Sequence, residues 1–117
     1  MTTGDQNAYA EIMVDMDGDD SNCDIISRGV AKDDSRQEIK LGINGKAVCK
    51  GHAECDSIIM DNAKILAIPQ LNAENVDASL VHEAAIGKIA GEQLLKLMTL
   101  GLSESEAEER IVQGFLK

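Results

Sequence analysis

Aromatic side chains are almost absent from this sequence, since Tyr9 and Phe115 are the only two among 117 residues and tryptophan is missing. This scarcity excludes a thick core built around large rings. Isoleucine, leucine, valine, methionine and alanine are plentiful and must fill the interior instead. Stacked aliphatic layers suit thin, repetitive β structures and helix pairs. The length fits one domain, which at this size can bury roughly two-thirds of its unfolded surface.

Positive charge is also scarce, because 11 basic residues face 21 acidic ones and give a formal net charge of −10. Such a surface repels phosphate groups, so we expect no binding to nucleic acid and none to an anionic membrane. No apolar run approaches the roughly 20 residues that a membrane span needs. The first residues also lack a basic region followed by an apolar one. We therefore expect a cytoplasmic protein.

The cysteines are odd in number, so Cys23, Cys49 and Cys55 cannot all be paired within the chain. In a cytoplasmic protein they are expected to be reduced thiols. His52 lies between Cys49 and Cys55, but their spacing is too wide for the usual cysteine pairs of zinc sites. The acidic run at 15–20 lacks the glycine and glutamate positions of a calcium-binding EF-hand loop. It is interpreted as an acidic turn.

Most of the chain, from residue 8 to about 86, contains short runs in which apolar and polar residues alternate. A period of two predicts half-buried strands, here over 10–16, 39–43 and 76–84. Shorter apolar runs predict further strands at 58–60 and 65–68, the second bounded by Pro69. Turn signals recur at Asp17-Gly18, Asn44-Gly45, Asp61-Asn62 and 72–75. This pattern predicts a mainly β fold, and a likeness between residues 23–26 and 55–59 favours a solenoid over a sandwich.

The last thirty residues have a helical period and predict a two-helix hairpin. One apolar face of the first helix is formed by Ile89, Leu94, Leu97 and Met98. Gly101 is placed to end that helix, and Ser103 with Glu106 forms a capping box that starts the next one. The second helix has its own apolar face, made of Ala107, Ile111, Val112 and Phe115. We therefore divide the chain into a β segment at 1–87 and a helical hairpin at 88–117, packed as a single compact unit.

His82 shares its parity with the apolar residues Ala78 and Leu80, so it is expected to face the interior, whereas Glu83 points the other way. Cys55 comes 27 residues earlier. A solenoid coil of about that length would place Cys55 and His82 on neighbouring rungs, about 4.8 Å apart. A thiolate and an imidazole at that spacing could hold iron or a nascent iron–sulfur cluster. The alternatives are a core histidine bonded to a backbone carbonyl, and the nucleophilic Cys55/His82 pair of a small thiol enzyme.

The chain resembles the C-terminal region of the SufB and SufD proteins, the scaffolds of the SUF system of iron–sulfur cluster assembly. The matching motifs are Ile26-Ser27-Arg28-Gly29-Val30, Glu54-Cys55-Asp56-Ser57-Ile58, Pro69, His82-Glu83-Ala84, Gly87-Lys88-Ile89, Gly101-Leu102-Ser103 and Gly114-Phe115. The glutamate that follows His82 makes the likeness closer to SufB than to SufD.

The resemblance implies a right-handed parallel β-helix, of which this chain would hold the last few coils, followed by the two-helix hairpin. It also implies a non-enzymatic scaffold in which Cys55, His82 and Glu83 are the candidate ligands. Cys55 and His82 would hold the transient iron or iron–sulfur cluster. Whether Cys23 or Cys49 contributes is left open by the sequence.

Partners also follow from the resemblance. Residues 88–117 would dock a SufC-like ABC-type ATPase, and the chain would associate with a SufB/SufD-type partner. Because the open end of a solenoid leaves apolar side chains and strand edges uncovered, we also expect self-association, most simply as a homodimer. The alternative function is an interaction module of the same fold that docks partners without cluster chemistry.

Overall fold

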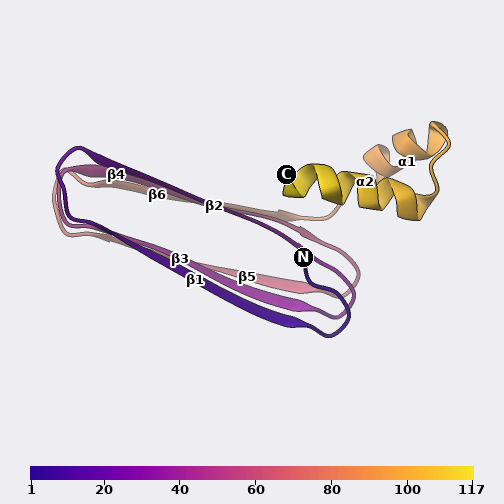
Figure 1. Ribbon diagram of the computed structural model, residues 1–117, viewed down its shortest axis with the longest axis horizontal. Coiled ribbons are helices and arrows are strands. Elements are labelled where there is room, and N and C mark those ends of the chain that lie inside the picture. Colours follow the sequence, from indigo (N-terminus) through magenta and orange to yellow (C-terminus); the bar gives the residue numbers. More distant parts are fainter.

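The computed structural model describes all 117 residues, with six strands followed by two helices (Figure 1). The strands are β1 (Asn7–Met16), β2 (Ser21–Ala31), β3 (Arg36–Gly45), β4 (Cys49–Ile59), β5 (Lys64–Ala73) and β6 (Ser79–Gly87). The helices are α1 (Gly91–Thr99) and α2 (Glu104–Leu116).

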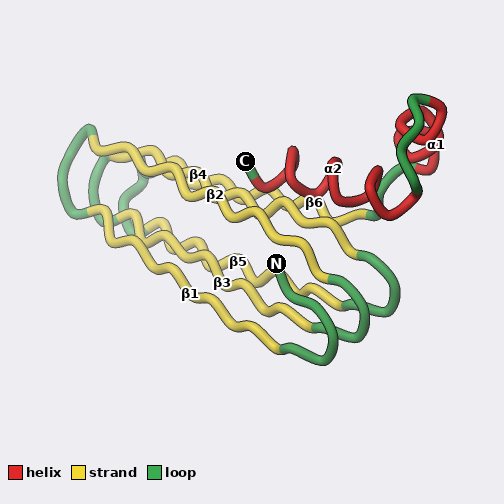
Figure 2. The backbone as a smooth tube through the Cα atoms, turned by 45° about the vertical axis from the view of Figure 1, so that its right-hand side comes forward, coloured by secondary structure: helices red, strands yellow, loops and turns green.

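Successive strands alternate between two parallel sheets, ordered β1-β3-β5 and β2-β4-β6. Figures 1 and 2 show these sheets as two layers joined by loops at both ends, with α2 lying alongside the β2-β4-β6 sheet near one end and α1 beyond that end. The molecule is elongated, with extents of 54 × 29 × 17 Å. A chain that passes from sheet to sheet and adds one parallel strand at each return is β-helix-like. The prediction of a mainly β fold with two C-terminal helices is confirmed.

The structural repeat is 28 or 29 residues long. Asn7 pairs with Arg36, 29 positions later, and Arg36 pairs with Lys64, 28 positions later. The likeness between residues 23–26 and 55–59 is out of this register, because Cys23 pairs with Gly51. The likeness between these two segments is therefore not a structural repeat, although the solenoid that it favoured agrees with the β-helix-like arrangement of the sheets.

One turn position repeats with the same period. Gly4, Asp33 and Asp61 all have positive φ angles, of 59°, 60° and 57°. The Asp33 carboxylate accepts a hydrogen bond from the Gly4 amide at 2.9 Å, and the Asp61 carboxylate accepts one from the Asp33 amide at 3.3 Å. Aspartate tolerates this left-handed conformation better than most residues because its short side chain bonds locally. The ladder of aspartates aligns the turns of successive coils.

The core lies between the two sheets and is aliphatic, as the composition requires. Leu41 and Ile43 from β3 are almost fully buried, and they pack in one cluster with Ile25 from β2 and Ala53 from β4. Complete burial of a leucine or isoleucine stabilises a fold by about 1.5–3 kcal/mol. The interior is tight at Gly51, where an added Cβ would lie 2.9 Å from Leu80 Cδ2.

Three boundaries differ from the expectation. Pro69 does not end its strand, because β5 continues through it to Ala73. β5 is the edge of its sheet, where a residue without an amide hydrogen is tolerated. Asn44-Gly45 is the end of β3 rather than a turn, and its alignment is set by hydrogen bonds from Asn44 to Asp15 and from Asn72 to Asn44. Val76 precedes β6 and is 99% exposed.

The helical hairpin is confirmed, and its second helix begins with the predicted capping box. Ser103 Oγ accepts a hydrogen bond from the Glu106 amide, and the Glu106 carboxylate accepts one from the Ser103 amide at 2.8 Å. The backbone bond from Ser103 lowers the pKa of Glu106. Gly101, with a φ of 97°, follows the end of α1.

The hairpin is attached to the β segment through α2. Ala107 and Val112 are buried, and α2 contacts β2, where Arg28 donates a hydrogen bond to the Lys117 carbonyl at 2.9 Å. By contrast, α1 packs on α2 and has no buried residue. Neither helix has the length and apolar character that a membrane crossing requires. The division at residue 87 stays a prediction.

Candidate functional site

Cys55 and His82 lie on adjacent strands, β4 and β6, and both belong to the inward-facing set. They are not direct neighbours across the sheet, because His82 pairs with Ala53 and Cys55 pairs with Ala84. The repeat of 29 residues at this point, rather than 27, displaces the two side chains by two positions along the strands. Cys55 and His82 do lie on neighbouring strands of one sheet, as expected. The expectation that they lie directly opposite each other is wrong.

The Cys55 thiol is fully buried, and its Sγ lies 3.9 Å from Ser57 Oγ. Burial raises the pKa of Cys55 above its ordinary value, and the Ser57 hydroxyl opposes this shift in part. Burial also raises the pKa of Cys23. These two thiols are therefore protonated at neutral pH, and all three cysteines, Cys49 included, are free.

His82 has a buried ring nitrogen, Nε2, with no hydrogen-bond partner. The interpretation of His82 as a core histidine satisfied by a carbonyl therefore fails at this atom. A buried polar atom without a partner costs about 1–3 kcal/mol. An imidazole nitrogen left open in this way is suited to accept a proton donor or to bind a metal ion.

Glu83 is separated from the other two predicted ligands. Because side chains alternate along β6, Glu83 points outward next to the inward-facing His82, and its side chain is 65% exposed. The structure thus brings Cys55 and His82 to one face of the β2-β4-β6 sheet and Glu83 to the other.

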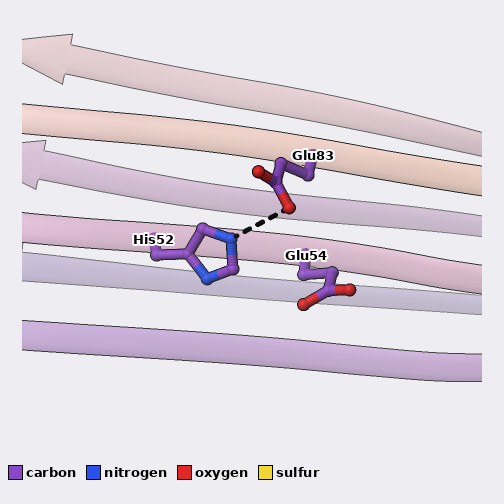
Figure 3. A group of neighbouring side chains, drawn as sticks. All are labelled: His52, Glu54 and Glu83. Atoms are coloured by element: carbon purple, nitrogen blue, oxygen red, sulfur yellow. Dashed lines mark ion pairs between the residues drawn. The ribbon is translucent and has the colours of Figure 1, made fainter.

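The outer face of this sheet carries a second group of side chains. His52 and Glu54 from β4 and Glu83 from β6 each offer one ligand atom, and these atoms all lie within 4.8 Å of one another. Figure 3 shows His52 and Glu83 directed toward one another, with Glu54 beside them. His52 Nε2 is 3.5 Å from a Glu83 carboxylate oxygen, and His52 Nδ1 is 2.9 Å from Asp24 Oδ1 on β2.

Electrostatics on this face favour positive charge. The hydrogen bond with Asp24 is the main cause that raises the pKa of His52, and the contact with Glu83 adds to it. The pKa of Glu54 is raised because its carboxyl group contacts that of Asp56. Crowded carboxylates beside a histidine can hold either a proton or a cation.

Sequence reasoning missed His52 and Glu54 as partners of Glu83. Two signals were present: His52, Glu54 and Asp56 alternate with the small inward residues of β4, and Glu83 follows Glu54 by one 29-residue repeat. The alternation along β4 shows that His52 and Glu54 share one face of the sheet. The spacing of Glu54 and Glu83 identifies them as neighbours only when the 29-residue register is known.

Comparison with known proteins identifies the family. Residues 1–115 match the family model described as SUF system FeS cluster assembly, SufBD core domain. Over 105 residues, 89% of the chain, it is 42% identical to an iron-sulfur cluster assembly SufBD family protein of Methanocaldococcus jannaschii. SufBD family proteins of Archaeoglobus fulgidus and Methanothermobacter thermautotrophicus are 41% and 38% identical over 86% of the chain.

These matches cover 33%, 27% and 25% of the three relatives, so the chain spans about a quarter to a third of their length. Within that span the similarity runs through both sheets and the hairpin. The chain therefore belongs to the SufBD family of iron–sulfur cluster assembly proteins.

Proposed function

We propose that this chain is a non-enzymatic scaffold segment of the SUF system, in which Cys55 and His82 hold iron or a nascent iron–sulfur cluster as cargo. The observation that carries the proposal is the buried, unpartnered Nε2 of His82, which lies one strand away from Cys55 on the same inner face. A thiolate and an imidazole are both ligands of iron–sulfur centres.

Cys55 must lose a proton before it can bind the cargo, because the thiolate is the ligand. Its raised pKa means that binding releases a proton into a buried environment and becomes stronger as the pH rises. Glu83 lies on the opposite face and is left out of this ligand set. The burial of Cys55 supports slow loading of the cargo rather than rapid exchange with solvent.

Turnover by a Cys55/His82 pair is disfavoured by the same chemistry. A nucleophilic cysteine needs a lowered pKa and access to its substrate. Cys55 has a raised pKa and a fully buried side chain. We therefore keep the proposal of a scaffold rather than a thiol enzyme.

The handedness of the β-helix is a second part of the proposal. Each strand returns to its own sheet by a crossover through the other sheet. Crossovers between parallel strands of one sheet are right-handed in about 98% of cases. We infer the right-handed parallel β-helix that the family resemblance implies.

The hairpin at 88–117 is the proposed docking site for a SufC-like ABC-type ATPase. Support comes from α1, which has no buried residue and, with the residue after it, exposes Leu95, Met98 and Leu100. The outermost strands of both sheets support pairing with a SufB/SufD-type partner or a second copy, because they leave backbone groups unpaired. A cytoplasmic location and the absence of contacts with nucleic acid and membrane stay predictions.

Anaerobic reconstitution with iron and sulfide tests the cluster proposal. We expect visible charge-transfer absorption in the wild-type chain, lost in Cys55→Ser and strongly reduced in His82→Gln. Equal absorption in wild type and Cys55→Ser would refute the proposal. No iron uptake by a folded wild-type chain would favour the alternative of a docking module.

Docking is tested separately by mixing the chain with a SUF-system ATPase and measuring complex formation by size-exclusion chromatography with light scattering. We expect a complex that Leu95→Glu weakens and that Cys55→Ser leaves intact. Binding that persists in Leu95→Glu would place the interface elsewhere.

A further inference from the structure

The outer face of the β2-β4-β6 sheet holds a cluster that the proposed function does not use. His52 and Glu54 are two residues apart on β4, so they point to the same side. Glu83 is the direct cross-strand neighbour of Glu54 on β6. Three ligand-bearing side chains are therefore fixed on two hydrogen-bonded strands rather than on mobile loops.

The orientation of the His52 ring is an independent observation. Asp24 lies beside His52 on β2 and contacts Nδ1 at 2.9 Å, which leaves Nε2 directed towards Glu83. A carboxylate that accepts the Nδ1 hydrogen fixes the tautomer with a lone pair on Nε2. This is the arrangement in which metal-binding histidines are usually held.

Distances also fit a single ion. Nitrogen and carboxylate ligands lie about 2.0–2.2 Å from a small divalent ion, so two of them are at most about 4.4 Å apart. The three ligand atoms here are already within 4.8 Å of one another. Small rotations of side chains that are partly exposed would bring them into a coordination sphere.

We propose that His52, Glu54 and Glu83 form a mononuclear site for a divalent first-row transition metal ion, with Asp24 as the positioning residue behind His52. One imidazole and two carboxylates suit zinc, iron(II), cobalt or manganese, whereas a site without cysteine is poorly suited to soft ions. Water molecules complete the coordination sphere. The site needs neither sulfide nor Cys55, so it goes beyond the cluster proposal and can fail or succeed independently of it.

The chemistry of the neighbourhood supports a cation at this position. Asp56 adds a further carboxylate beside Glu54, and the carboxylates of Asp24 and Glu83 outnumber the one ammonium group, that of Lys50, which lines the same hollow as His52. An ion bound by His52 Nε2 would replace the contact between His52 and Glu83 and would separate the crowded carboxylates.

Cobalt(II) titration of the full chain, followed by optical absorption, tests the site without sulfide. We expect one ion per chain, displaced by zinc. Affinity should fall at least about tenfold in His52→Gln and in Glu83→Gln, and by about 10–100-fold in Asp24→Asn, which removes the negative charge behind the His52 ring and weakens its hydrogen bond. Glu74→Gln removes the same charge from a distant turn and should leave the affinity unchanged.

Nuclear magnetic resonance of the histidine rings identifies the ligand directly, because His52 and His82 are the two histidines of the chain. Zinc should shift the ring resonances of His52 and leave those of His82 in place. A shift of the His82 resonances without a shift of His52, or unchanged affinity in folded His52→Gln, would each overturn the proposal.

Discussion

The inner and outer faces of the β2-β4-β6 sheet carry opposite chemistry on the same strands. The inner face presents a buried thiol at Cys55 and an unpartnered nitrogen at His82, in an aliphatic core. On the outer face His52 and Glu83 lie in a partly exposed, acidic surface. Because strands alternate, the neighbours His82 and Glu83 serve different faces. Although His82 and Glu83 are adjacent in the sequence motif, they therefore cannot both bind one ion on a single face of the sheet.

Two neighbouring isoleucines on β2 give the largest expected contrast between the faces. Ile25 points inward and is 8% exposed, whereas Ile26 points outward and is 49% exposed. Ile25→Ala should lower the free energy of unfolding by about 2–5 kcal/mol, and Ile26→Ala by less than about 1 kcal/mol. Urea denaturation measures both. Similar losses at the two positions would show that the layers are not packed as described.

Thiol reactivity gives a second contrast. Burial and a raised pKa should make alkylation of Cys55 at least about tenfold slower in the folded chain than in the urea-unfolded chain. Mass spectrometry of peptides containing Cys55 follows the reaction. Equal rates in the two states would mean that the inner face is open to solvent.

The third prediction concerns the pKa of His52 on the outer face, where the expected effect is smaller. Its pKa should lie above the ordinary value of about 6.5, and Asp24→Asn should lower it, because the bond to Asp24 is the main cause of the shift. Nuclear magnetic resonance titration of the His52 ring measures both values. If the pKa of His52 is the same in Asp24→Asn as in the wild type, the hydrogen bond to Asp24 does not raise it.

The same proton links stability to pH. A histidine whose pKa is raised by folding stabilises the fold fully below its unfolded pKa, about 6.5. That contribution is lost as the pH rises through the raised value. Asp24→Asn should therefore destabilise the chain more at about pH 6 than at about pH 9, a difference measured by urea denaturation. A constant difference would contradict the linkage.

Local patterns predicted much of the fold. Alternation located β1 and β3, and the pair Ser103 and Glu106 located the start of α2. These signals are readable because they depend on a strand's own faces or on one turn of helix. Pro69 misled because whether a proline ends a strand depends on the strand's place in the sheet, which is not a local property.

The site was less predictable because it depends on register. The inward direction of His82 followed from parity, but its neighbour across the sheet is Ala53 rather than Cys55. That register depends on the lengths of both turns between β4 and β6, and a local pattern such as the parity of His82 does not report these lengths. The group of His52, Glu54 and Glu83 could not be assembled without this register.

Pulsed electron paramagnetic resonance of the reduced, reconstituted cluster tests the central claim most directly. The account predicts nitrogen coupling from an imidazole ligand that persists in His52→Gln and disappears in His82→Gln. Coupling lost in His52→Gln and kept in His82→Gln would place the cluster on the outer face and contradict the account.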